Sequence, residues 1–522
     1  MMARNPGGWH RLTAIVLAVT SALAVGLASA SLARPMFEDQ AVMAYLGFLV
    51  DRVGLVPYRD FFDMNTPGAY VANVVVGRLA GYTEAGARLV DLGWLAVLLI
   101  VTVVVMRPFG RWTGWCAAAF TSAIYLSAGA PLTLQREVLL VPLLGAALAL
   151  AARAGARPGP RALAVGLLIG GAATIKPQMG VFALAVLAPP WPGLARGRAA
   201  AAVVSGALLA PGAAALYLWR HDALGPFLDI ATHYWPLYNA FTGERPHEVL
   251  NGVVGLAYRV RGAVTLGGHP ALPLAGAAVL GVLAARRTAP PAAAAPRTLH
   301  LLVAALVAGW VAVIPAGKFW AQHWWPFSYV AVLLGSLACA DGRSGTAWLR
   351  PATLALLSLG ISWGDIAPRG WTPRFPFAHV ERIAAYLVAH MAPGDTVVPL
   401  DWIEGAQHAM LRARARPGTS FVYDFHFDHH LSSPYIQALR ARFVNELDER
   451  RPRFLIRIHR PDRFSGSDTS SSFPALETRM HAAYRRVLAD ADYEVWERRA
   501  PLVEPGRRNR IPPVSGTPTA AP

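Results

Sequence analysis

The sequence predicts a polytopic α-helical membrane protein that carries a small α/β domain at its C-terminal end. The 522-residue chain is 54% hydrophobic and only 15% charged, whereas an ordinary soluble domain carries about 25% charged residues. Apolar runs of about 20 residues, the length that spans a bilayer, recur as far as about residue 365. Beyond that point the charge rises, and helix and strand signals alternate, which is typical of a small α/β domain.

The apolar runs predict about eleven spanning helices. They cover roughly residues 11–33, 85–106, 112–130, 136–153, 161–175, 177–192, 199–219, 270–285, 298–316, 320–340 and 347–364. We therefore assign residues 1–365 to a transmembrane domain. Residues 366–500 form the α/β domain, and residues 501–522, rich in Pro, Arg, Ser and Thr, are expected to be a disordered tail.

The placement of arginine predicts the orientation in the membrane. Every second loop between the predicted helices is rich in Arg, and such loops face the cytoplasm. The alternate loops and the α/β domain should then lie on the opposite, non-cytoplasmic side of the membrane, with the N-terminus inside. Ala28-Ser-Ala30 also resembles a signal-peptidase site, and cleavage there would leave the following loop outside as well.

Charge and cysteine content bear on two other protein classes. The formal net charge of +17 could indicate a nucleic-acid partner, but much of the Arg lies in short loops, where membrane topology explains it. We therefore expect no nucleic acid. The two cysteines, Cys116 and Cys339, lie inside apolar runs, so no disulfide framework is indicated.

The first outer loop, residues 34–84, holds four carboxylates just beyond the first predicted helix: Glu38, Asp39, Asp60 and Asp63. Acids near lipid cost free energy, so their presence favours chemistry or binding. Glu38 or Asp39 could act as a general base on an incoming hydroxyl or amine, or could hold a divalent metal. Solvated loop acids are the plain alternative. Arg59 is the expected ion-pair partner of Asp60 or Asp63.

Two segments are expected to lie at the membrane interface. Residues 66–84 are too short and interrupted to span, and one apolar helical face would hold Tyr70, Val74, Val75 and Leu79. The loop at about 220–269 offers aromatic anchors at the level of the lipid headgroups: His233, Tyr234, Trp235 and Tyr238.

Three further motifs carry basic groups at the outer ends of predicted helices: Arg136-Glu137, Lys176-Pro177, and Lys318 with His323 among tryptophans of residues 317–326. Each has a plain explanation, namely the helix dipole, snorkelling and an aromatic belt. The functional interpretation is that the four basic side chains bind a phosphate, with Glu137 as a second carboxylate of the site. Tryptophan would then offer a platform for a sugar or an isoprenoid.

The predicted α/β domain shows local signals only. Helices are expected at 381–389 and about 435–450, and strands at 396–400 and 454–458. The run Asp424-Phe-His-Phe-Asp-His-His430 could bind a metal, although its spacing matches no specific zinc pattern.

With these motifs assembled, the chain resembles the GT-C membrane glycosyltransferases, specifically the bacterial relatives of protein O-mannosyltransferases and of the aminoarabinose transferases that modify lipid A. Asp39-Gln-Ala41 is similar to the first-loop Asp-Glu motif of that group, in which the Asp is the catalytic acid or base, although Gln40 stands where Glu is usual. The later motifs follow in the same order along the chain: Val56-Pro-Tyr-Arg-Asp-Phe-Phe-Asp63, Arg136-Glu137, Lys176-Pro177 and Gln322-His323-Trp324.

The resemblance implies a sugar transferase that takes its sugar from a polyprenyl-phosphate donor at the outer face of a bacterial inner membrane. The N-terminus would then be cytoplasmic and the α/β domain periplasmic. The acceptor would be an envelope lipid, polysaccharide or protein. A divalent metal is a possible cofactor. Two other functions remain open, a transporter or flippase of a lipid-linked saccharide and a non-catalytic membrane scaffold. Transporters often show internal repeats and polar residues at the midplane, whereas here the charges cluster at the outer helix ends and no repeat is found.

Overall fold

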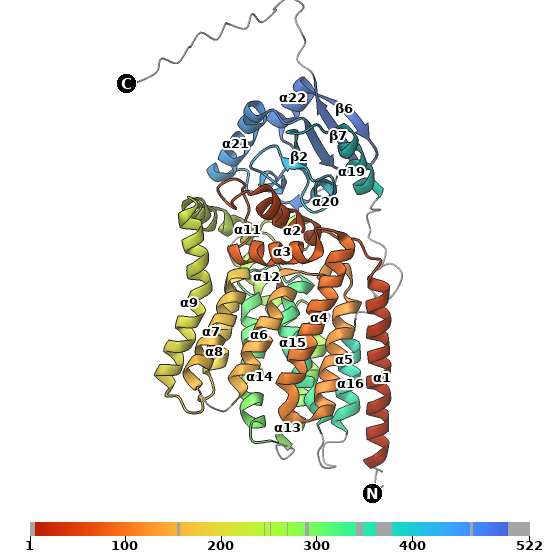
Figure 1. Cartoon of the computed structure of the whole chain (residues 1–522), viewed down its shortest axis with the longest axis vertical. Helices are drawn as coiled ribbons and strands as arrows, with labels where there is room; N and C mark the ends of the chain where they lie inside the picture. Colours follow the sequence, from red (N-terminus) through yellow and green to blue (C-terminus); the bar gives the residue numbers. More distant parts are fainter. Residues whose placement is uncertain are drawn as a thin grey trace, which may run out of the picture.

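The computed structural model describes residues 6–153, 157–244, 246–250, 252–268, 270–287, 292–340, 348–361, 378–459 and 463–499. A bundle of upright helices carries an α/β portion on one end (Figure 1). Each predicted span coincides with helical structure. The bundle helices are α1 (Pro6–Ser31), α4 (Glu84–Met106), α5 (Arg111–Ser127), α6 (Arg136–Ala152), α7 (Pro158–Ile175), α8 (Phe182–Leu187), α9 (Arg196–Arg220), α13 (Ala271–Arg287), α14 (Ala295–Val313), α15 (Trp325–Ser336) and α16 (Leu349–Leu359).

Five helical segments of the described chain are long and apolar enough to cross a membrane: Arg11–Ser31, Glu84–Phe109, Pro158–Ile175, Arg196–Arg220 and Ala295–Val313. The predicted number of eleven crossings is therefore not confirmed. Helices α5, α6 and α13 have 17 residues each. Seventeen residues rise about 25 Å, somewhat less than the roughly 30 Å of a hydrocarbon core.

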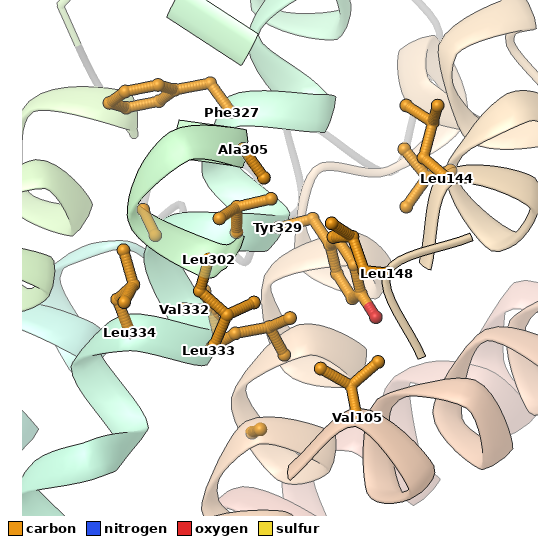
Figure 2. Packing of buried hydrophobic residues seen from close by; sticks show 14 of the residues in the cluster. Val105, Leu144, Leu148, Leu302, Ala305, Phe327, Tyr329, Val332, Leu333 and Leu334 are labelled. Carbon is orange, nitrogen blue, oxygen red and sulfur yellow. The ribbon is translucent and has the colours of Figure 1, made fainter. Parts of the chain in front are cut away.

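The interior of the bundle is built around α15, in which every residue is buried. Figure 2 shows Tyr329 and Leu333 of α15 among aliphatic side chains from neighbouring helices, including Leu148 of α6 and Leu302 of α14. The Tyr329 hydroxyl lies 3.0 Å from the Thr102 hydroxyl of α4, which gives the phenol a polar partner inside an apolar core. Outer helices expose apolar side chains such as Ile100 and Leu208, as contact with lipid requires.

Short helices lie across the end of the bundle, below the α/β portion (Figure 1). They are α2 (Asp39–Phe48), α3 (Pro67–Ala80), α10 (Leu224–Asp229), α11 (Trp235–Ala240) and α12 (Gly252–Val264). The helix predicted within residues 66–84 is present as α3, and its exposed apolar stripe is Val71, Val75 and Leu79. Tyr70 does not belong to that face, because it is buried against the first outer loop.

The predicted headgroup anchors are wrong in part. Tyr234 is fully buried, and its ring packs against His426 of the α/β portion, since the loop before α11 is covered by that portion. His233 is exposed, and its ring stacks on Tyr435.

Residues 378–499 form a five-stranded sheet with helices around it. The strand order is β3-β2-β4-β7-β6, with β2 (Thr396–Leu400) parallel to β3 (Arg416–Pro417) and β4 (Phe454–Ile458). β7 (Tyr493–Arg498) is antiparallel to β4 and to β6 (Tyr484–Ala489). The helices are α19 (Ala378–His390), α20 (Ala406–Arg412), α21 (Pro434–Arg450) and α22 (Pro474–Ala483). The predicted strands and helices of this portion are confirmed, whereas the predicted boundary at 365/366 and the tail 501–522 lie outside the described residues.

The α/β portion is attached to the end of the bundle by several contacts. The Tyr45 hydroxyl of α2 donates to the Ala415 carbonyl at 3.1 Å. Glu84, at the start of α4, lies 2.7 Å from His408 Nε2 and accepts from Arg412 Nε at 2.9 Å. A two-residue strand, β1 (His247–Glu248), pairs with β5 (Phe464–Ser465). Through these contacts the α/β portion covers the end of the bundle at which the predicted site residues lie.

Candidate active site

A polar cavity of about 450 Å³ lies at the covered end of the bundle. The four basic residues predicted to bind phosphate all line it, although they come from three separate stretches of the chain: Arg136, Lys176, and Lys318 with His323. The first outer loop contributes Asn65 and Thr66, and α11 contributes Trp235 and Tyr238. Distant chain segments therefore place several cationic groups around one space, which is an arrangement suited to an anion.

Arg136 links the cavity to the predicted base. It begins α6, two residues after Leu134, whose φ of 50° turns the chain into the helix. Its Nη1 donates to the Asn65 side-chain oxygen, and its Nη2 lies 3.7 Å from Asp39 Oδ2. Asp39 is partly exposed, at 24%, so a carboxylate stands beside this cation, although Asp39 is not itself among the residues that line the cavity.

The two candidate bases point to different places. Asp39 begins α2, and Glu38 immediately before it has φ 40° and ψ −123°, a conformation that L residues rarely adopt. Glu38 lines a much smaller pocket of about 20 Å³ together with His379 and His408 of the α/β portion. Of this pair, Asp39 is the one that the structure places beside Arg136.

Lys176 is held by a buried ion pair. It follows the last residue of α7, and Pro177 starts the next helical turn. Its ammonium pairs with Glu137, whose side chain is 1% exposed, and His323 Nε2 lies 3.5 Å from the same carboxylate oxygen. A buried carboxylate needs such a cation, so Glu137 fixes Lys176 at the wall of the cavity.

Lys318 has a different set of partners. Its ammonium donates to the Tyr238 carbonyl at 2.6 Å and to the Phe241 carbonyl, and lies 3.3 Å from the centre of the Phe241 ring. Burial lowers the pKa of Lys318 well below its ordinary value, and Arg259 nearby lowers it further. Lys318 therefore ties the end of α11 to the cavity wall in addition to lining the space.

The tryptophans of residues 317–326 do not form the expected platform. Trp324 and Trp325 are 1% and 4% exposed and belong to the bundle core, and Trp320 donates to the Gly243 carbonyl at 2.7 Å. The aromatic wall of the cavity comes instead from Trp235 and Tyr238. The sequence analysis predicted Trp235 and Tyr238 to be interfacial aromatics, because no local sequence pattern indicates that α11 folds back over the site.

The remaining acids of the first outer loop separate into an exposed pair and a buried centre. Arg59 donates to Asp60 at 2.8 Å, and Asp60 accepts the Val56 N–H at 2.7 Å, so this pair shapes the loop at the surface. Asp63 is fully buried and accepts from the Met64 N–H, the Asn65 amide and the Tyr70 hydroxyl. Burial raises the pKa of Asp63, while these hydrogen bonds favour its ionised form.

The His- and Asp-rich run in the α/β portion is occupied by internal contacts. Arg463 pairs with Asp424 and lies 3.6 Å from Asp428, while His426 Nδ1 is 2.6 Å from the Tyr234 hydroxyl. Among the residues that the structure describes, no group of three or more His, Cys, Asp or Glu side chains is arranged to hold a metal ion. The metal role considered for this run therefore finds no support in its geometry.

An apolar groove of about 820 Å³ adjoins the polar cavity. Its walls come from α3, α4, α6, α7 and α9 and include Val74, Leu143, Gly171 and Leu218, and Ile175 lines both spaces. The two spaces meet where α3 crosses the end of α7. Gly68 permits this crossing, because a Cβ at that position would lie 2.5 Å from the Thr174 carbonyl carbon.

Comparisons with known proteins establish the fold. The chain is similar to the crystal structure of ArnT from Cupriavidus metallidurans bound to undecaprenyl phosphate, with 13% identity over 96% of this chain and 100% of that one, at a TM-score of 0.53. The apo structure of the same protein matches 94% of this chain and 98% of that one at 13% identity, with a TM-score of 0.51. No family model and no curated protein matches the chain. The GT-C fold inferred from the sequence is thus confirmed.

Proposed function

We propose that this chain is a membrane glycosyltransferase that moves a sugar from a polyprenyl-phosphate donor to an envelope acceptor on the periplasmic face of the inner membrane. The observation that carries the proposal is the polar cavity, in which Arg136, Lys176, Lys318 and His323 meet beside an apolar groove. A polyprenyl phosphate likewise has a charged phosphate, which would lie in the cavity, joined to a long apolar chain, which would lie in the groove. The shared fold with ArnT, which binds undecaprenyl phosphate, adds support.

The groups that line the cavity and Asp39, which lies beside Arg136, have separate roles in the proposed reaction. The Asp39 carboxylate removes the proton from the acceptor hydroxyl or amine as that atom attacks the anomeric carbon. The bond between the anomeric carbon and the phosphate oxygen breaks, and the lipid phosphate leaves with the electron pair. A single displacement of this kind inverts the anomeric centre.

The cations act where negative charge develops. As the sugar departs, charge builds on the phosphate oxygens, and fixed cations at that place stabilise the transition state more than the ground state. Arg136 and Lys176 are already held by Asn65 and Glu137, so little reorganisation is needed at the moment of reaction. His323 and Lys318 line the same cavity and would donate hydrogen bonds to the phosphate oxygens.

The apolar groove would hold the lipid tail of the donor. Its lining is almost entirely aliphatic and aromatic, with Arg78 as its charged member. Burying apolar chain yields roughly 25 cal/mol per Å² without demanding exact geometry, which suits a long and flexible isoprenoid. The arginine-rich alternate loops predict that this end of the bundle faces outside, and residues 366–500 would then cover the site from the periplasm.

The test is the replacement of the proposed base in cells. We expect a deletion strain to lose one envelope glycan modification in mass spectrometry, and the wild-type chain to restore it. Asp39→Asn keeps the size of the side chain but cannot accept the proton, so transfer should fall by about 100-fold or more. Glu38→Gln is the matched control and should restore the modification, because Glu38 faces the small pocket below α20. Full activity of folded Asp39→Asn would remove Asp39 as the base.

A further inference from the structure

Arg136 stands between two oxygen acceptors that compete for it. One is the Asn65 side-chain oxygen, which accepts from Nη1, and the other is Asp39 Oδ2, 3.7 Å from Nη2. A guanidinium and a carboxylate that approach each other without hindrance commonly form two parallel N–H···O hydrogen bonds, with N···O distances of roughly 2.7–2.9 Å. The observed separation is longer, so Arg136 makes its closer contact with Asn65.

The orientation of the Asn65 amide is fixed from both ends. Asp63 Oδ1 accepts the Met64 N–H at 2.8 Å, Oδ2 accepts the Tyr70 hydroxyl, and the Asn65 nitrogen lies 2.9 and 3.1 Å from the two oxygens. The Asn65 NH₂ group donates to both oxygens of Asp63. A guanidinium only donates, so the amide oxygen must face Arg136. Each neighbour demands the same orientation.

The backbone around Asn65 is equally constrained. The Tyr58 hydroxyl donates to the Asn65 carbonyl at 2.5 Å, and the Thr66 hydroxyl donates to the Ile175 carbonyl at 2.6 Å. Pro67 then begins α3. These hydrogen bonds hold the backbone that carries the Asn65 side chain. One of them also joins this backbone to Ile175, the residue before Lys176.

We propose that Asn65 is a positioning residue for the transfer reaction: oriented by buried Asp63, it holds the Arg136 guanidinium toward the phosphate and keeps it from closing on the Asp39 carboxylate. The inference rests on the proposed function and adds a residue that the sequence motifs had not singled out. Closure of Arg136 onto Asp39 would remove the cation from the phosphate and occupy the oxygen that must accept the proton. Asn65 thus keeps the cation and the base available as two separate groups.

The experiment measures binding of undecaprenyl phosphate to the purified full-length chain in detergent. Four variants are compared with the wild type: Asn65→Ala, Arg136→Ala, the double variant, and Asn73→Ala. Asn73 is the matched control, because it is a buried asparagine two turns along α3 whose amide donates to the Ala69 carbonyl at 2.8 Å and which does not line the cavity.

We expect Asn65→Ala to weaken binding about tenfold, as loss of a hydrogen bond to a charged group does, and Arg136→Ala to weaken it at least as much. The double variant should bind no more weakly than Arg136→Ala, because Asn65 acts through Arg136. A purely structural role would make the two losses multiply, since independent effects add in free energy. Asn73→Ala should bind as tightly as the wild type.

Other outcomes would contradict either the positioning role of Asn65 or the proposed donor site. Wild-type affinity of Asn65→Ala, or multiplied losses in the double variant, would remove the positioning role while leaving the proposed function in place. Wild-type affinity of Arg136→Ala would remove the proposed donor site and the inference together. If Asn65→Ala does not fold, Asn65→Ser takes its place in the same cycle, because a serine hydroxyl can bond Asp63 but is too short to reach Arg136 as well.

Discussion

The polar cavity and the apolar groove adjoin each other, yet they are built by different means. The cavity is assembled from five separate stretches of chain. Three of its basic groups have specific partners: Asn65 for Arg136, Glu137 for Lys176, and two carbonyls for Lys318. The groove is lined by apolar side chains of packed helices, whose contacts are not directional. A charged headgroup demands fixed dipoles, whereas a flexible tail demands only area.

This difference makes a general expectation. Changes in the cavity should affect turnover and headgroup binding steeply, because each partner holds a single geometry. Changes in the groove should affect the binding of long lipids gradually and leave turnover at saturation intact.

The largest effect is expected from the ion pair between Lys176 and Glu137. Lys176→Met leaves a buried carboxylate without its cation, which costs about 3–5 kcal/mol, and should both destabilise the chain and abolish transfer. The double variant with Glu137→Gln removes both charges, so it should recover most of the melting temperature. Transfer should stay about 100-fold low, because the cation facing the phosphate is still missing.

The recovery of stability without recovery of activity is the decisive feature of that pair of variants. If the double variant transferred sugar at the wild-type rate, Lys176 would be a structural counter-ion of Glu137 only. The cavity would then resemble the groove in tolerating substitution, and the contrast between the two spaces would fail.

The groove gives the next largest effect. Gly171 lines it, and a Cβ there would meet only Leu143 Cδ1 at 3.7 Å, so Gly171→Ala should be silent. Gly171→Leu should fill part of the groove and raise the KM for undecaprenyl phosphate-linked donor about tenfold, with kcat unchanged. A donor with a short prenyl chain should be used equally well by both variants. A fall in kcat with the short donor would show that the groove also shapes the cavity.

The elements predictable from the sequence are those set by local patterns. The strands predicted at 396–400 and 454–458 match β2 and β4 residue for residue. Short runs of β-branched and aromatic residues between turn residues can be recognised as strands from the local sequence alone. The helix at about 435–450 and the helical character of each predicted span also follow from periodicity. The site motifs could be placed at helix ends for the same reason.

What the sequence could not supply is the set of long-range contacts. Asn65 gains its role only through Arg136, 71 positions away, and no rule of spacing joins them. Trp235 and Trp324 are both aromatic residues near helix ends, yet one lines the cavity and the other lies in the core. Burial distinguishes them, and burial depends on how α11 folds back beneath the α/β portion.

The smallest expected effect concerns the cover of the cavity and its response to acid. Burial lowers the pKa of His426 to about 3, from about 6.5 in the unfolded chain. Between these values the unfolded chain binds the extra proton, so stability that is complete above pH 6.5 is lost as the pH falls, at up to about 1.4 kcal/mol per pH unit. His429, also buried beside Tyr234, has a lowered pKa and acts in the same direction.

Melting curves between pH 7 and pH 5 test this response. The wild type should lose stability on acidification, and His426→Phe, which fills the same aromatic surroundings without a titrating group, should lose less. His390→Gln is the control, because His390 is exposed, and should behave as the wild type.

Tyr234 touches His426 and directly precedes α11, whose Trp235 and Tyr238 line the cavity. Acid should therefore weaken phosphate binding in the cavity before it disturbs the groove, and equal loss in both would mean that the cover acts on the whole bundle end rather than on the cavity.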